Sequence, residues 1–306
     1  MSDAQNVRFC EVILNGEYEG LYVMTEMITG GKDGARLGLR VNTKHSTFSG
    51  YLLRLDHQHA GEEALNSFTT YTYKTPFMLQ IEYPGSRNRD ARLTEEIRQD
   101  FSNFEKTLYS NDYDREKHGY TSMIDVDSFV DYFIINELSS NADAGNYSTY
   151  IYKGTDNLYR MCVWDFNNAC NNYFEEELPY TGFFLNNRLW FEMLIKDEDF
   201  TERIIQRYHS LRKGLLSEES LYRYIDETLD FIAPALARND ARWGSVEQQA
   251  KGLLVPVSRN LDSRSAAEGQ LKGYLRNRGK WLDENIETLR QYSASSRVKQ
   301  YNEVND

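Results

Sequence analysis

Residues 141–153 read Asn-Ala-Asp-Ala-Gly-Asn-Tyr-Ser-Thr-Tyr-Ile-Tyr-Lys, and residues 161–172 read Met-Cys-Val-Trp-Asp-Phe-Asn-Asn-Ala-Cys-Asn-Asn. Both segments are rich in strand-forming residues, and Gly154-Thr-Asp-Asn157 between them is typical of a turn. A β-hairpin brings its two outer ends together, so we expect Asp143 and Asp165 to be neighbours in space. Closely spaced carboxylate and amide oxygens suit a hard cation such as Mg2+. This stretch therefore predicts the functional site.

Composition limits the classes of protein that the chain can belong to. Its 306 residues are 40% hydrophobic and 27% charged, which is ordinary for a globular protein. The net charge of −12 (35 Lys and Arg against 47 Asp and Glu) and the lack of a Lys/Arg-rich run argue against nucleic-acid binding. No apolar run approaches the length of a membrane span, and no signal-peptide pattern opens this chain. We expect no nucleic-acid partner and no membrane span.

The three cysteines do not predict a disulfide framework or a zinc site. Cys10, Cys162 and Cys170 are an odd number and show no C-x-x-C spacing. They are expected to be small buried residues.

Two other stretches resemble binding motifs and are interpreted otherwise. Gly30-Gly-Lys-Asp-Gly34 lacks the G-K-[ST] ending of a phosphate-binding loop, so it predicts a surface turn. Asp56-His-Gln-His59 lacks a third ligand at zinc spacing, so it predicts a solvated strand end.

The pattern along the chain predicts an α+β fold, with an antiparallel sheet in the N-terminal part and helices in the C-terminal part. The expected strands are 7–14 and 18–25, joined at Asn15-Gly16, then 50–56, 68–74, 77–83 and the hairpin 147–153/158–166. The first expected helix has an apolar stripe from Leu93 to Leu108, and the second runs from an Asp127 N-cap to Asn141. A short helix is expected at 189–195, followed by one with an Asp199/Glu202 capping box that runs to Lys213. The next is capped by Ser217 and kinked or ended by Pro234, and the last covers 266–291. We expect one domain over 1–306, mainly β in 1–90, helices plus the hairpin in 91–172, and helical in 173–306.

Several segments form longer motifs. They are Asn15-Gly-Glu-Tyr-Glu-Gly-Leu-Tyr-Val-Met-Thr-Glu26, Gly50-Tyr-Leu-Leu-Arg-Leu-Asp56, the run from Asp125 to Asp143, Ser148-Thr-Tyr-Ile-Tyr-Lys153 and Val163-Trp-Asp-Phe-Asn167. These motifs resemble those of the spore-coat protein H (CotH) kinase family, an atypical bacterial protein kinase-like family. The helical tail from Trp190 to Asp283 is also similar to that family, so the resemblance covers nearly the whole chain.

The resemblance implies an atypical protein-kinase-like fold that transfers phosphate from ATP, with Mg2+ or Mn2+, to Ser or Thr of a protein substrate. Carried over by position, Asp143 matches the catalytic-loop aspartate and Asp165 the metal-binding aspartate. Asn172 matches the asparagine of a Gly-Asn pair that follows in the family, and with Asn167 it completes the expected metal ligands. Phosphoryl transfer agrees with this set, because it needs mainly positioning and charge neutralisation.

Cofactor contacts are expected from Trp164, Asn146 and Glu26. Trp164 offers a face on which adenine can stack, although packing in the core is the commoner role of an aromatic residue. Asn146 offers an amide oxygen near the metal. Glu26 matches the family signature, and two roles stay open for it: pairing with a basic group or supporting the fold.

The chain departs from the family pattern at three places. The family often has Asp at the position of Asn167 and Gly at the position of Asn171, although Asn tolerates left-handed geometry well. Family domains also carry basic residues before the Asn15-Gly16 signature, so part of the nucleotide pocket is expected to lie outside this chain. Within it, the candidates for a phosphate contact are Lys44, Arg40 and Arg54.

A second hypothesis is a catalytically inactive kinase-like module that binds a partner in a spore coat or a secreted bacterial assembly. A metal-dependent hydrolase is weaker, because the chain lacks a His-based ligand set. The resemblance implies a spore coat or the cell exterior as the location, and a coat or secreted protein as the substrate.

Overall fold

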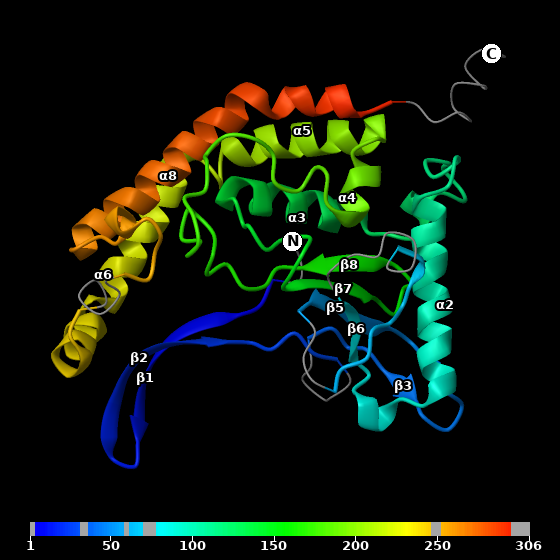
Figure 1. Ribbon diagram of the computed structural model, residues 1–306, viewed down its shortest axis with the longest axis horizontal. Helices are drawn as coiled ribbons and strands as arrows, with labels where there is room; N and C mark the ends of the chain where they lie inside the picture. The colour runs from blue at the N-terminus through cyan, green and yellow to red at the C-terminus, as the bar shows by residue number, and fades with distance from the viewer. Residues whose placement is uncertain (1–3, 31–35, 58–60, 70–77, 246–251, 295–306) are drawn as a thin grey trace.

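The structure is a computed structural model that describes residues 4–30, 36–57, 61–69, 78–245 and 252–294 (Figure 1). The strands are β1 (Val7–Leu14), β2 (Glu17–Thr25), β3 (Val41–Asn42), β4 (Thr47–Phe48), β5 (Tyr51–Asp56), β6 (Met78–Tyr83), β7 (Thr149–Lys153) and β8 (Tyr159–Cys162). The α-helices are α2 (Ala91–Leu108), α3 (Val126–Ser139), α4 (Leu189–Leu194), α5 (Glu198–Arg212), α6 (Glu218–Trp243) and α8 (Arg264–Asn285). Antiparallel strands in the N-terminal part and helices in the C-terminal part confirm the predicted α+β class.

The predicted hairpin forms and completes the main sheet, although its second strand ends at Cys162 and not at Phe166 as predicted. β7 and β8 pair antiparallel, with Tyr150 opposite Cys162 and Lys153 opposite Tyr159. β7 also pairs with β5, so the four-stranded sheet has the order β6-β5-β7-β8. The strands predicted at 50–56 and 77–83 correspond to β5 and β6. Of the strand predicted at 68–74, Phe68 and Thr69 are helical instead, and the rest lies outside the described residues.

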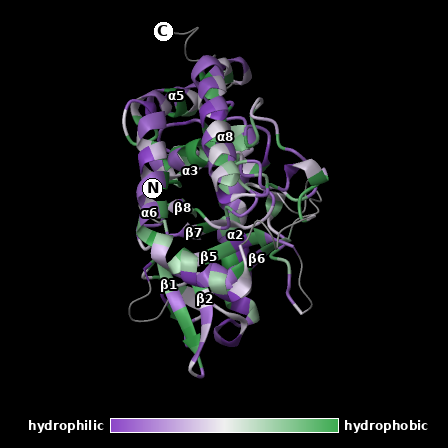
Figure 2. Cartoon of the chain, turned by 90° about the vertical axis from the view of Figure 1, so that its left-hand side faces the viewer, coloured by the Kyte–Doolittle hydropathy of each residue, from purple (hydrophilic) through white to green (hydrophobic). Residues whose placement is uncertain are grey.

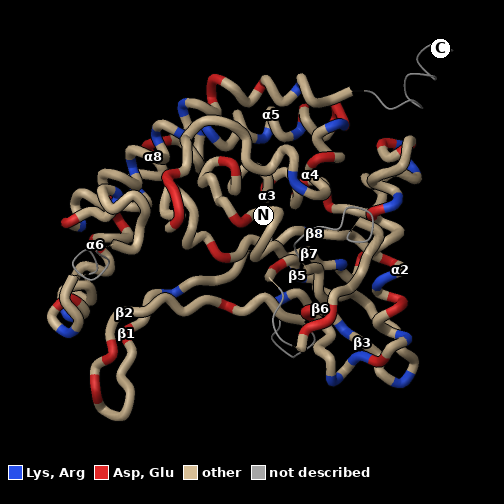
Figure 3. Tube along the Cα trace, viewed as in Figure 1, with Lys and Arg blue, Asp and Glu red and all other residues tan. Residues whose placement is uncertain are grey.

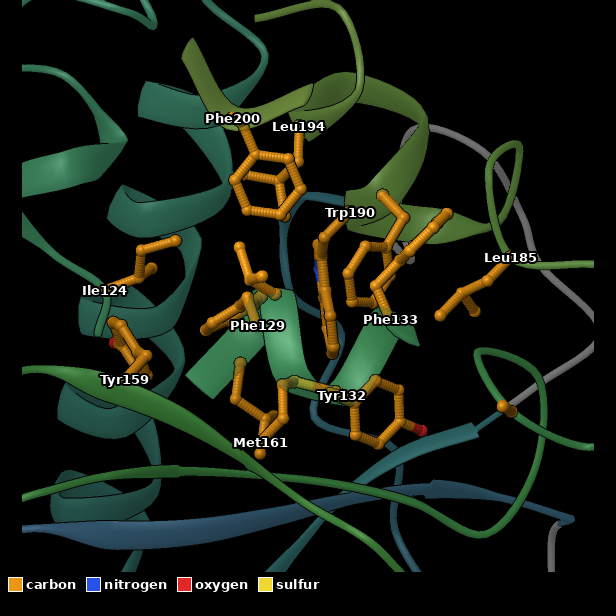
Figure 4. Close-up of a cluster of buried hydrophobic side chains, with 14 of the residues drawn as sticks. Ile124, Phe129, Tyr132, Phe133, Tyr159, Met161, Leu185, Trp190, Leu194 and Phe200 are labelled. Atoms are coloured by element: carbon orange, nitrogen blue, oxygen red, sulfur yellow. The ribbon is translucent and has the colours of Figure 1, made fainter. Parts of the chain in front are cut away.

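Helices α2 and α3 supply the core that lies against this sheet. The predicted stripe of α2 is fully buried, since Leu93, Ile97, Phe101, Phe104 and Leu108 are at most 1% exposed. Figure 4 shows how aromatic residues of α3 meet residues of the sheet and of α4. Each buried side chain of this size contributes about 1.5–3 kcal/mol of transfer free energy. This packing fixes the end of α3, from which the chain enters the predicted site.

Three helix boundaries differ from the prediction. The N-cap of α3 is Asp125, whose carboxylate accepts from the Ser128 amide, and Asp127 lies in the first turn. The N-cap of α5 is Asp197, whose carboxylate accepts from the Asp199 amide, so Asp199 and Glu202 form no capping box. Pro234, predicted to kink or end its helix, lies inside α6, which continues to Trp243, so of the two predicted effects the end does not occur.

The hairpin β1–β2 projects from the main sheet (Figure 1). Asn15 and Gly16 have φ of 53° and 87°, as the predicted type I′ turn requires. The hairpin carries both hydrophobic and hydrophilic residues (Figure 2), and its outer half is fastened to α6. Arg238 binds the Glu11 carboxylate through two nitrogens, at 2.6 and 2.7 Å, and Trp243 donates to the carbonyl of Glu19 at 2.7 Å. The C-terminal half of the chain therefore holds the N-terminal hairpin in place.

Two predicted absences concern the described part of the chain. None of the three cysteines forms a disulfide; Cys162 is buried as predicted, whereas Cys10 and Cys170 are only partly buried. In the ranges that the structure describes, no helix combines the length and the apolar character needed to cross a membrane.

Candidate functional site

Asp143 lies in a tight turn directly after α3. The helix ends at Ser140, which takes the left-handed conformation with φ of 48°. The carbonyl of Asp143 then accepts from the amides of Asn146 and Tyr147, at 2.9 and 2.8 Å. Buried Asn141 supports the turn, because its side chain donates to the Asn136 side chain at 3.1 Å. The predicted catalytic aspartate thus stands on a backbone that hydrogen bonds fix on both sides.

The carboxylate of Asp143 is held by Asn168, a residue that the sequence did not single out. The Asn168 side-chain amide donates to Oδ2 of Asp143 at 2.7 Å. One carboxylate oxygen is therefore oriented by the protein. Asn168 follows the Trp-Asp-Phe-Asn motif, and only this proximity could have suggested it.

Asp165 lies just beyond the end of β8 with an exposed side chain. Its φ of 56° is left-handed, a conformation that Asp adopts more readily than most residues and that often occurs at functional sites. The Ser148 hydroxyl donates to Oδ2 of Asp165 over a long 3.4 Å. The loops that carry the two aspartates therefore meet at two contacts: Asn168 with Asp143, and Ser148 with Asp165.

The loop after Asp165 is held by its own side chains. The Asn172 side-chain amide donates to the Asn167 carbonyl at 2.8 Å, and both side chains are exposed. Asn171 has φ of 65° and accepts from the Leu178 amide at 2.7 Å through its side chain. The expected tolerance of Asn171 for left-handed geometry is confirmed. Neighbouring Cys170 is no nucleophile, because burial raises the pKa of its thiol to about 12.

A mainly apolar cleft of about 530 Å3 adjoins Asp165. The base of the hairpin β1–β2 forms one wall, and the other wall comes from the segment after β8. The lining residues are Ala4, Gln5, Val7, Val23, Thr25, Val163, Trp164, Asp165 and Phe166. Trp164 also packs edge-on against Tyr150, with ring centres 6.0 Å apart, so the predicted stacking residue has both a core contact and a cleft-facing side.

A larger cavity of about 920 Å3 lies elsewhere, between residues 114–121 and α5. Side chains of both charges line it, and neither Asp143 nor Asp165 is among them. The smaller cleft is the candidate site, because Asp165 and Trp164, two of the predicted site residues, line it.

Glu26 and Asn146, the other two expected cofactor contacts, lie at the base of the hairpin β1–β2 and in the turn after Asp143. The Glu26 carboxylate accepts from the backbone and side chain of Asn6, at 3.2 and 3.0 Å, and pairs with Arg36 at 3.3 Å. Hydrogen bonds from Asn6 and the charge of Arg36 lower the pKa of Glu26. Glu26 thus closes the base of the hairpin and meets a basic group there. Asn146 is half-buried in the turn after Asp143.

The basic candidates do not line the cleft in the part of the chain that the structure describes. Arg54 on β5 donates to Glu62 and Gln80 at 2.8 Å, and Arg40 donates to the carbonyl of Leu39 at 3.0 Å. Lys44 lies in the turn between β3 and β4. Lys153, from the Ser-Thr-Tyr-Ile-Tyr-Lys motif, binds the Asp100 carboxylate of α2 at 2.7 and 2.8 Å. This motif lysine therefore ties α2 to the sheet.

Asp165, Asn167 and Asn172 are the residues that could hold a magnesium-type ion, one that keeps most of its waters. No group of three or more His, Cys, Asp or Glu side chains among the described residues is placed to hold a metal. The exposed carboxylate of Asp165 and the amide oxygens of Asn167 and Asn172 are oxygen ligands of the kind that Mg2+ combines with water and phosphate.

Comparisons with known proteins identify the family of the chain. A search of curated proteins found no match. A family model described as CotH kinase protein matches residues 1–282, which is most of the chain. The chain therefore belongs to the CotH kinase protein family.

Proposed function

We propose that the protein transfers the γ-phosphoryl group of ATP to Ser or Thr hydroxyls of a protein substrate, with Mg2+ or Mn2+. The observation that carries the proposal is the meeting of the Asp143 and Asp165 loops beside the Trp164 cleft. We also propose that residues 1–306 form one domain. The hairpin β1–β2, whose base forms one wall of the cleft, is bound to α6 through Glu11 and Arg238.

Each residue has a distinct part in this reaction. Asp143, with one oxygen fixed by Asn168, orients the acceptor hydroxyl and takes its proton as the oxygen attacks the γ-phosphorus. The bond between the γ-phosphorus and the bridging oxygen breaks, and ADP leaves. Asp165, Asn167 and Asn172 would hold the metal, which neutralises phosphate charge when it is bound. Val7, Val23 and Trp164 line the apolar cleft and would enclose the adenine there.

The substrate is proposed to be a protein of the spore coat or of the cell exterior, since the family is associated with the spore coat. Lys and Arg are interspersed with Asp and Glu along the helices (Figure 3), and the net charge is −12. The prediction that nucleic acid is not a partner rests on this charge.

One observation favours the second hypothesis of an inactive binding module. Among the described residues, no Lys or Arg lines the cleft, so none there can neutralise the phosphates of ATP. A module of this kind would keep the fold and bind a partner without phosphoryl transfer.

Thermal melting and radiolabel transfer distinguish the two hypotheses. A nucleotide that binds only the folded state adds about 2.7 kcal/mol at 100-fold over its Kd, so ATP with Mg2+ or Mn2+ is expected to raise the melting midpoint by several degrees. Asp165→Asn is expected to remove the metal-dependent part of this shift and to abolish label transfer from ATP to protein. Asp127→Asn, an exposed change in the first turn of α3, serves as control. No shift at millimolar ATP with either metal, together with no transfer, would establish the inactive module instead.

A further inference from the structure

One arginine outside the family motifs holds the backbone on both sides of Asp143. Nη1 of Arg188 donates to the carbonyl of Ala142 and to the carbonyl of Ala144, each at 2.7 Å. These carbonyls belong to the residues immediately before and after Asp143. A single charged nitrogen thus fixes the peptide groups that set the direction of the Asp143 side chain. Charge-assisted bonds of this kind are shorter and stronger than neutral ones.

The turn is shaped to let this arginine approach. Gly145 has φ of 80°, and a Cβ built on it would lie 2.8 Å from Cδ1 of Leu185 and 3.1 Å from Cβ of Arg188. Real Cβ atoms essentially never come within 3.0 Å of a neighbour, so a side chain at 145 would displace the Leu185 side chain and press against Arg188. The glycine of the turn and the arginine that braces it form one arrangement.

The segment that carries Arg188 is itself anchored. The amides of Phe184 and Leu185 donate to the buried carboxylate of Glu137, near the end of α3, at 2.7–3.1 Å. The Tyr109 hydroxyl donates to the carbonyl of Leu189 at 3.1 Å. Because its own segment is anchored, Arg188 holds the turn around Asp143 in a fixed position relative to α3.

The charges around Arg188 support its place beside Asp143. Burial lowers the pKa of Arg188, and the carboxylates of Glu137 and Asp143 oppose this. The guanidinium stays charged because its reference pKa is so high. Its positive charge therefore attracts the carboxylate of Asp143, which is proposed to act on the acceptor hydroxyl.

We propose that Arg188 is a positioning residue, which sets the orientation of Asp143 toward the acceptor hydroxyl that attacks ATP. The proposal deepens the proposed phosphotransfer and rests on it. The reason is geometric: misplacing a reacting group by about 1 Å can cost on the order of 100-fold in rate.

The chain offers a matched control for the test. Nη1 of Arg89 also donates to two backbone carbonyls, of Ile81 and Pro84 at 3.1 and 3.0 Å, and burial also lowers the pKa of Arg89. It lies between β6 and α2, away from Asp143. Arg188→Met and Arg89→Met therefore remove similar contacts, and only the first touches the turn.

The experiment measures phosphotransfer kinetics and amide hydrogen exchange for these two variants and for Arg188→Lys. Arg188→Met is expected to lower kcat at least tenfold with KM for ATP within about twofold. Exchange at the amides of Asn146 and Tyr147, which donate to the Asp143 carbonyl, is expected to speed up at least tenfold. Arg188→Lys should restore part of kcat and part of the slow exchange, and Arg89→Met should change neither kcat nor the exchange at these amides.

The two readouts separate this proposal from the proposed function. If the wild type transfers no phosphate, the function fails, and exchange at residues 141–147 still decides whether Arg188 holds the turn. Wild-type exchange and wild-type kcat in Arg188→Met would overturn the proposal, as would an equal kcat loss in Arg89→Met. If Arg188→Met does not fold, Arg188→Lys and Gly145→Ala replace it, and unchanged exchange and kcat in both would be equally decisive.

Discussion

Replacing Arg278 by methionine is expected to lower the free energy of unfolding by about 3–5 kcal/mol, because it leaves a buried carboxylate without its counter-charge. Arg278 and Glu137 are 0% and 1% exposed, and Nη2 of Arg278 lies 2.7 Å from Oε2 of Glu137. The same guanidinium donates to the carbonyls of Glu137, Tyr180 and Gly182. The pair therefore joins the end of α3 to α8 and to the segment that contains Tyr180 and Gly182.

Urea denaturation measures this effect. The matched control is Arg290→Met, which breaks an exposed pair with Glu202 and should cost less than about 1 kcal/mol. In the double variant Glu137→Leu/Arg278→Met no unpaired charge remains, so we expect it to recover part of the loss. A loss below 1 kcal/mol in Arg278→Met would show that Glu137 is satisfied without its partner.

The loss in Arg278→Met should also grow with pH. Burial raises the pKa of Glu137, and the charge of Arg278 opposes this, so removing the arginine raises the pKa further. A carboxyl whose pKa is raised on folding contributes stability below its unfolded pKa, and this contribution is lost as pH rises through the folded value. The difference in stability from the wild type should therefore be larger at pH 8 than at pH 5. A difference that is independent of pH would contradict this origin.

Local patterns predicted much of the fold. Asn15-Gly16 fixed the turn of β1–β2 because few other pairs accept positive φ at both positions. The stripe of α2 and the strands β7 and β8 followed from periodicity, which depends only on near neighbours. Two helix starts were misplaced because Asp recurs two residues apart, at 125 and 127 and at 197 and 199, and each gives the same capping signal.

Contacts over long sequence distances could not be predicted from one sequence. α6 continues past Pro234, where Arg238 and Trp243 beyond the proline bind the hairpin β1–β2. Arg188 meets Ala142 across 46 positions, and Arg278 meets Glu137 across 141. The motifs contain Asp143, Asp165 and Ser148, whereas Asn168 and Arg188, which hold Asp143 and its turn, lie outside them.

Asp143→Asn is expected to lower kcat for phosphoryl transfer by about 100- to 10,000-fold and to leave the ATP-dependent rise in melting midpoint unchanged. An amide has nearly the shape of the carboxylate, and its oxygen can still accept from Asn168. What it loses is the ability to take the hydroxyl proton, which matters for the chemical step and not for binding nucleotide. The measurements are label transfer from ATP and melting with ATP and Mg2+.

The combination of results decides the role of Asp143. Loss of transfer with a retained melting shift assigns Asp143 to the acceptor hydroxyl, whereas Asp165→Asn should lose both because Asp165 is proposed to hold the metal. Loss of both in Asp143→Asn would instead place Asp143 among the groups that bind metal or nucleotide. Asp127→Asn, on the exposed surface of α3, should keep both properties. Equal labelling in Asp143→Asn and the wild type would show that Asp143 has no part in the reaction. The turn that Asn168 and Arg188 hold would then supply no proton acceptor that the reaction needs.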